Sequence, residues 1–198
     1  VQSVIEDKKG RIWIATMGGL VKLDGVTYTD YNDVEGLTSL KISSLAEDPA
    51  GNIWIGTLDG GIFKFDISKD SIPVSLLAAK GILSSNKINS LNFIRDTLVA
   101  AGNDKGFDLL ILDKSLMIRH VIHYGINDGF TGGENSSNSI AVDSEGMVWI
   151  GTKNGLMRYN LFKDFNYSSL PETRITGIKL FFEEVDWKTR DFNNINSF

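Results

Sequence analysis

Short apolar stretches recur along the chain and are separated by turns rich in glycine and aspartate. The stretches are about five residues long and consist mainly of β-branched and aromatic residues, as in Ile12-Trp13-Ile14, which is typical of short antiparallel strands. No window of about a dozen residues keeps a helical period without an intervening glycine. The pattern therefore predicts an all-β protein.

One ten-residue pattern occurs three times, at 7–16 (DKKGRIWIAT), 48–57 (DPAGNIWIGT) and 143–152 (DSEGMVWIGT). In each copy an Asp precedes a Trp by six positions. A period of about 40–50 residues is typical of β-propellers, whose blades are four-stranded sheets. The shared positions, which we call the repeat signature, are Asp7, Gly10, Trp13, Thr16, Asp48, Gly51, Trp54, Thr57, Asp143, Gly146, Trp149 and Thr152.

The gap between the second and third copies leaves room for a degenerate unit. Trp13 and Trp54 are 41 residues apart, whereas Trp54 and Trp149 are 95 apart. We align residues 98–102 (LVAAG) with 53–57, which puts Val99 in place of the Trp and gives spacings of 41, 45 and 50. The sequence thus predicts four four-stranded antiparallel propeller blades within 1–170, at about 1–40, 41–86, 87–136 and 137–170.

The Asp-x-x-Gly segments predict tight hairpin turns, because Asp can cap the first position and Gly suits the fourth, where φ is often positive. Because the Asp recurs in every clear unit, we expect it to cap a turn of the blade rather than to act as a catalytic carboxylate. The tryptophans of the signature could stack on sugars, but a Trp fixed among Ile and Val most simply packs one blade against the next. Lys22, Lys64 and Arg158 take matching positions, and we expect them on solvated strand faces.

Composition narrows the possible functions. The 198 residues include 20 Lys and Arg, 25 Asp and Glu and no Cys, with a formal charge of −5. This balance gives no basic field for nucleic acid or an anionic membrane, and it excludes disulfides and thiolate chemistry. No apolar run reaches the ~18 residues of a membrane helix, and the start lacks both an initiator Met and a signal-peptide pattern. We expect a soluble segment of something larger.

No catalytic or metal constellation is predicted. His120 and His123 are three apart, so on one strand they point to opposite faces and cannot chelate one ion. The residue types for Ser-His-Asp catalysis are present without a nucleophile elbow, and Gly151-Thr152-Lys153 lacks the order of a phosphate loop. We expect no catalytic residue, no metal ligand and no cofactor, and assign no ligand-binding residue.

Two regions depart from the repeat and are the places where a ligand could be recognised. The second turn of each unit varies, with Asp59-Gly60, Asn103-Asp104 and Asn154 at matching positions. The stretch 129–138 (GFTGGENSSN) is the least repeat-like part of the blades. It either lines a ligand surface or only makes a long link between two blades.

The W-I-G-T after D-x-x-G, followed by G-L and an aromatic tail, resembles the two-component regulator propeller repeats of bacterial sensor proteins over about residues 1–167. Residues 174–187 (RITGIKLFFEEVDW) resemble the opening of the three-tyrosine domain that follows such propellers. We therefore assign 171–198 to a truncated start of that immunoglobulin-like domain. In this family the two domains form an extracytoplasmic sensor region, joined through a membrane helix to a histidine kinase.

The resemblance implies a non-enzymatic ligand-sensing and interaction segment in the periplasmic part of a membrane-anchored histidine kinase of a two-component system. It implies an oligosaccharide or another small molecule as ligand, with no nucleic acid and no direct membrane contact. One alternative is a cytoplasmic regulator, with the same two domains fused to a DNA-binding domain. Another is a propeller enzyme, either a lyase or a glycan hydrolase.

Propellers of this family normally have more than four blades, so the four units are expected to be part of a larger ring. An incomplete ring leaves two apolar blade flanks in water, at a cost of about 25 cal/mol per Å². We therefore expect self-association of the segment, with two four-blade halves covering each other's flanks.

Overall fold

The computed structural model describes residues 1–68, 74–79, 81–160, 178–180 and 183–185. Contacts divide the chain into two units, Val1–Leu161 and Phe162–Phe198. The described elements are all strands apart from one short 3-10 turn, η1 (Ile126–Asp128). The all-β fold predicted from the repeat is confirmed. No helix in the described ranges is long and apolar enough to cross a membrane.

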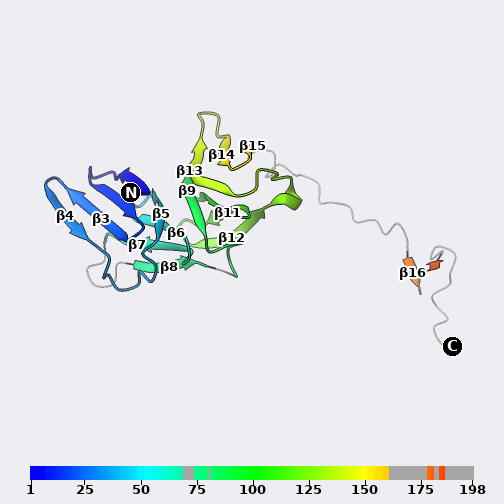
Figure 1. Ribbon diagram of the computed structural model, residues 1–198, viewed down its shortest axis with the longest axis horizontal. Helices are drawn as coiled ribbons and strands as arrows, with labels where there is room; N and C mark the ends of the chain where they lie inside the picture. The colour runs from blue at the N-terminus through cyan, green and yellow to red at the C-terminus, as the bar shows by residue number, and fades with distance from the viewer. Residues whose placement is uncertain (69–73, 80, 161–177, 181–182, 186–198) are drawn as a thin grey trace. The chain divides into compact units, whose positions relative to one another are not determined.

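The first unit contains four antiparallel sheets, which we call blades one to four (Figure 1). Blade one comprises β1 (Ser3–Glu6), β2 (Ile12–Thr16), β3 (Gly19–Asp24) and β4 (Thr27–Asp30). Blade two comprises β5 (Ile42–Glu47), β6 (Ile53–Thr57), β7 (Ile62–Phe65) and β8 (Val74–Ala78). Blade three comprises β9 (Ile88–Arg95), β10 (Leu98–Asn103), β11 (Gly106–Leu112) and β12 (Ile118–Tyr124). Blade four has three strands within the described residues: β13 (Asn135–Val142), β14 (Val148–Thr152) and β15 (Gly155–Tyr159).

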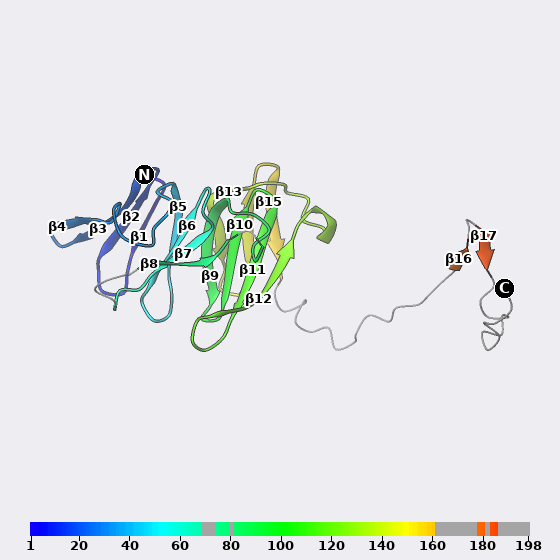
Figure 2. The ribbon, with the colours of Figure 1, turned by 90° about the horizontal axis from the view of Figure 1, so that it is seen from below.

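Strands within a blade pair in the order of the chain, so the first and last strands form its two edges. The first strands β1, β5, β9 and β13 pack close to one another, and we call them the inner strands (Figure 2). The outer strands β4, β8 and β12 lie at the opposite edges of their blades. Because the strands alternate in direction, the Asp-x-x-Gly turns lie at one end of every blade that has them, and the β2–β3 type of turn lies at the other.

The core consists of three apolar clusters, one between each pair of consecutive blades. The first joins Trp13 of blade one to Phe65 of blade two, the second joins Trp54 to Leu110, and the third joins blades three and four. Blades two and three therefore bury both faces against a neighbouring blade, whereas blades one and four each bury one face in these clusters. The packing of blade against blade through Trp13 and Trp54 is what the tryptophan pattern predicts.

The predicted alignment of the third blade is wrong by one residue. Gly56 of β6 pairs with Ile62, which follows a turn glycine, and Gly102 of β10 pairs with Phe107, which also follows one. Gly102 therefore corresponds to Gly56. This register places Ala100, rather than Val99, at the position of Trp54, and the spacings become 41, 46 and 49. Ala100 lies in the cluster that faces blade four, whereas Val99 faces blade two. The run LVAAG has no large side chain to fix its register, which explains the error.

In the second unit, β16 (Ile178–Leu180) pairs antiparallel with β17 (Glu183–Val185). Most of the segment assigned by resemblance to the three-tyrosine domain, 171–198, lies outside the described residues.

Candidate functional site

The signature Asp of blade one organises its own turn. Asp7 Oδ1 accepts hydrogen bonds from the backbone N–H groups of Lys9 at 2.9 Å and Arg11 at 3.0 Å. Its Oδ2 accepts the indole N–H of Trp13 at 2.8 Å. Gly10 has a φ of 77°, which glycine tolerates without strain. The six-residue spacing thus brings the turn and the core tryptophan onto one carboxylate.

The same network recurs in blades two and four. The indole N–H of Trp54 donates to Asp48 Oδ2 at 3.3 Å, and that of Trp149 donates to Asp143 Oδ2 at 2.7 Å. Hydrogen bonding from Trp149 lowers the pKa of Asp143. At Asp7, burial works to raise the pKa, but hydrogen bonds from Trp13 and Arg11 outweigh it and hold the pKa below its usual value. These carboxylates are committed to turns, which leaves them poorly placed for chemistry.

A basic residue stands across the strand pair from each signature tryptophan, a contact the sequence did not reveal. Trp13 pairs with Lys22, and Trp54 pairs with Lys64. Lys64 Nζ lies 3.6 Å from Asp48 Oδ2, and only 19% of its side chain is exposed. The expectation of a solvated face is therefore wrong for Lys64. Arg158 is exposed as expected, although its guanidinium lies 5.7 Å from the Trp149 ring centroid.

The tryptophans of the first two blades lie inside the protein. The ring centroids of Trp13 and Phe65 are 5.2 Å apart, and those of Trp54 and Phe93 are 5.1 Å apart. Trp13 and Trp54 are at most 1% exposed, so neither is available to stack on a sugar. Trp149 is half-buried.

The signature threonines close the turns at the other end of the blades. The hydroxyls of Thr16, Thr57 and Thr152 donate to a glycine carbonyl at 3.1, 2.9 and 2.9 Å. Asn103 takes this position in blade three, where its Oδ1 accepts the backbone N–H of Lys105 at 2.8 Å.

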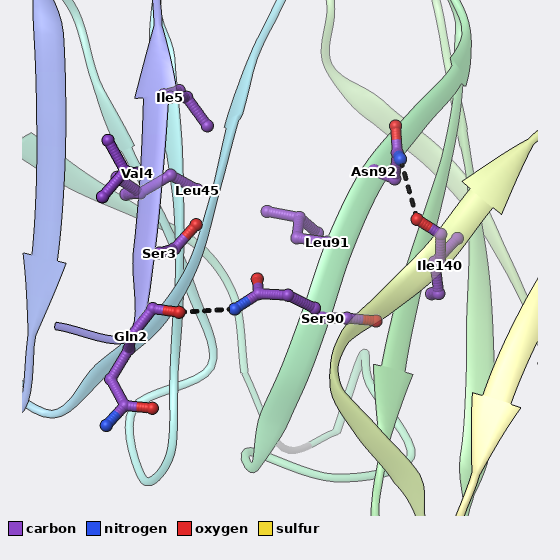
Figure 3. Close-up of a pocket in the computed structure, with 10 residues that line it drawn as sticks. Gln2, Ser3, Val4, Ile5, Leu45, Ser90, Leu91, Asn92 and Ile140 are labelled. Carbon is purple, nitrogen blue, oxygen red and sulfur yellow. Dashed lines mark hydrogen bonds between the residues drawn. The ribbon is translucent and has the colours of Figure 1, made fainter.

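A pocket of about 360 Å³ lies among the inner strands of all four blades (Figure 3). Among the described residues, no carboxylate, histidine, lysine or arginine lines it. We call it the inner-strand pocket, and its lining is Gln2, Ser3, Val4, Ile5, Leu45, Ser90, Leu91, Asn92, Asn138 and Ile140. The mixture of amides, two serine hydroxyls and aliphatic side chains suits an uncharged ligand with both polar and apolar faces.

Side-chain amides cross between blades at this pocket. Asn138 Nδ2 donates to the carbonyl of Gln2 at 2.6 Å and to that of Ser43 at 3.3 Å. Asn92 Nδ2 donates to the carbonyl of Ile140 at 3.1 Å (Figure 3). Asn138 has a positive φ of 49°, a conformation that Asn adopts more readily than most residues. The pocket wall is thus also where the blades are tied together.

The stretch 129–138 serves both as a link and as a lining. Glu134 forms ion pairs with Lys153 and, at 2.5 Å, with Lys87, and these two partners lower its pKa to about 2. Asn135 accepts a hydrogen bond from the Ser90 hydroxyl at 2.8 Å and so joins β13 to β9. Asn138, at its end, reaches the pocket.

The two histidines lie on β12, and only one has a buried partner. His123 Nδ1 is 2.8 Å from Oδ1 of Asp108, which is fully buried. Within the described ranges no three His, Cys, Asp or Glu side chains gather to hold a metal.

Of the residues that line the pocket, only Asn138 lies in a region that the sequence marked as a candidate ligand surface, the stretch 129–138. Ser90 and Asn92 alternate with Leu91 along β9, a period that places the two polar residues on one face. The sequence shows this alternation. Because the third unit lacks the signature residues, however, the sequence did not indicate which residues of β9 lie near the centre of the blades.

Comparisons with known proteins agree with the repeat. The family model of the two component regulator propeller matches residues 1–18, 36–59 and 131–154. No curated protein matches the chain.

Solved structures show the same fold. The extracellular domain of BT4673 from B. thetaiotaomicron, described as a one component or hybrid two component system, is 26% identical, with a TM-score of 0.65. That match covers 80% of this chain but only 22% of that extracellular domain. The extracellular domain of BT3049, a hybrid two component system from the same organism, is 19% identical over 93% of this chain and 32% of its own, with a TM-score of 0.52. Virginiamycin B lyase from Staphylococcus aureus is 13% identical over 79% of this chain and 54% of its own, with a TM-score of 0.54, and so shares the fold alone.

Proposed function

Because the chain carries two component regulator propeller repeats, we propose that it is a ligand-sensing segment of a two-component signalling receptor. The support is the match to BT4673, an extracellular domain of such a system. Since this chain spans 22% of that domain, the activity of the whole receptor belongs to the proposal. The proposal also includes a histidine kinase output, a periplasmic location, the three-tyrosine domain and self-association.

The inner-strand pocket is the observation that carries the proposal. It receives side chains from β1, β5, β9 and β13, so one bound molecule would contact all four blades at once. Its lining contains no group suited to general acid–base catalysis. Binding is therefore the chemistry that this site supports best, and an uncharged oligosaccharide or another neutral small molecule fits it.

A bound ligand would act on contacts between blades. Asn138 lines the pocket and also donates to Gln2 in blade one. A ligand that competes for this amide, or stabilises it, favours one spacing of the blades over another. Signalling requires that the ligand bind two such states with unequal affinity.

A filled pocket provides the test. Val4 lines the pocket and is 54% exposed, so Val4→Trp should occlude the pocket without disturbing the core. Val26 is 99% exposed in the β3–β4 turn, which makes Val26→Trp a matched control. The three proteins would be compared by thermal shift and titration calorimetry against a panel of neutral oligosaccharides.

We expect at least one oligosaccharide to stabilise the wild type and Val26→Trp but not Val4→Trp. An equal response of Val4→Trp would remove the pocket from the proposal. If no oligosaccharide of the panel stabilises or binds the wild type, carbohydrate is rejected as the ligand class.

A further inference from the structure

A second cavity, of about 410 Å³, opens on the opposite side of blades two and three, between their outer strands β8 and β12. We call it the outer groove. Five of its lining residues are apolar: Leu77, Ile82, Met117, Ile118 and Val121. It shares no residue with the inner-strand pocket, so it needs an explanation of its own.

Both outer strands are irregular where they border the groove. The pairing of β7 with β8 shifts so that Leu77 has no partner, and the pairing of β11 with β12 shifts so that Arg119 has none. Such bulges interrupt the ladder and redirect side chains. Two irregularities on neighbouring blades therefore border the same groove.

The apolar surface of the groove is exposed to solvent. Ile82, in the link between blades two and three, is 50% exposed, and Met117, in the β11–β12 turn, is 56% exposed. Beneath them Leu77, Ile118 and Val121 pack against the buried cluster that contains Trp54. Exposed apolar surface of this kind marks interaction sites.

Arg119 is the one charged side chain among the described residues that line the groove. The imidazole of His120 lies beside it, and none of these described residues is a carboxylate, although the chain carries a net charge of −5. Arg119 pairs with Asp113 at 2.7 Å, yet its side chain remains 71% exposed. An occupant with carboxylates beside apolar side chains is complementary to this lining.

We propose that the outer groove binds an extended peptide segment of a partner protein in which large apolar residues alternate with acidic ones. β8 and β12 are sheet edges, so their backbone edges offer hydrogen bonds to an added strand. The apolar side chains of the segment would enter beside Leu77 and Met117, and its carboxylates would face Arg119 and His120.

Charge reversal tests this proposal. The probes are two fluorescent octapeptides, one alternating Leu with Glu and one alternating Leu with Lys, measured by anisotropy. We expect the wild type to bind the Glu peptide at least tenfold more tightly. Arg119→Glu should abolish or invert this preference, while Lys9→Glu, the same charge change at an exposed site of blade one, should preserve it.

A second readout separates the groove from non-specific attraction. Hydrogen exchange should slow in β8 and β12 when the Glu peptide binds, and Met117→Asp should weaken that binding. Equal affinity for the two peptides, or an unchanged preference in Arg119→Glu, overturns the proposal. If Met117→Asp instead halves the mass of the protein in light scattering, a second copy occupies the groove and the peptide assignment is wrong.

Discussion

Blades two and three solve the same packing problem in different ways. Blade two carries the full signature, in which Asp48 holds its own turn, Trp54 and Lys64. Blade three has Ala100 at the tryptophan position, and its β9–β10 turn, Asp96-Thr97, is too short for the Asp-x-x-Gly pattern. Some of its buried polar side chains bond outside the blade, Asp108 to the link before it and Asn89 to β13 after it. Others stay within the blade, such as the contact of Asp108 with His123. A blade can therefore lose the signature network of Asp and Trp when other contacts hold it in place.

The largest effect should come from removing the central tryptophan of blade two. Trp54 is fully buried between two blades, so Trp54→Ala should lower the free energy of unfolding by about 4 kcal/mol in urea titrations. Trp149→Ala, at a half-buried position, should cost clearly less. Equal losses would mean that the signature tryptophan acts within its own blade rather than between blades.

The second comparison concerns two buried carboxylates. Asp48→Val should cost about 3 kcal/mol, because it strands the indole N–H and a backbone N–H inside the protein. Asp108→Val should cost less, about 1 kcal/mol, because the matching positions hold Val21, Phe63 and Met157 and the half-exposed His123 can turn to water. What remains is the loss of the hydrogen bond from the part-buried Ser84 N–H to Asp108. Urea unfolding of both variants measures the difference, and a larger loss in Asp108→Val would contradict the comparison.

The dependence of unfolding free energy on pH should reveal how much the ion pairs of Glu134 with Lys87 and Lys153 contribute to stability. The pKa of Glu134 is lowered from 4.5 to about 2, so its contribution to stability is complete above about pH 4.5 and is lost as the pH falls toward 2. Glu134→Gln should therefore be about 1 kcal/mol less stable than the wild type at pH 7. The two unfolding curves should converge by about pH 2, and a gap that persists there would assign the loss to packing.

The smallest effect is expected from restoring a repeat residue. Asn103→Thr reinstates the side chain found at Thr16, Thr57 and Thr152, whose hydroxyl closes the same turn. It also removes the 2.9 Å hydrogen bond from Asn103 to Ser84. These changes should cancel to within about 0.5 kcal/mol; a loss above about 1.5 kcal/mol would show that the link before blade three depends on Asn103.

The strands and the turn networks could be predicted because their determinants are local. An Asp, a Gly and a Trp within seven residues specify a hairpin and its buried face, as at 48–54. The predicted register was wrong at 98–102, because the small apolar residues there are compatible with two alignments that differ by one residue. The pocket could not be predicted, because Val4 and Asn138 are brought together only by the packing of four blades. Nor could the bulges at Leu77 and Arg119, which depend on pairing rather than on composition.

The hydrogen bond from Asn138 to Gln2 joins residues 136 positions apart. Closing a flexible loop of that length costs on the order of 4 kcal/mol in chain entropy, far more than one hydrogen bond returns. The contact can therefore form only after the intervening blades have folded and shortened the effective loop. In folding kinetics it should be among the last native contacts to appear, and its amide should report the moment when the first and fourth blades have both reached their places.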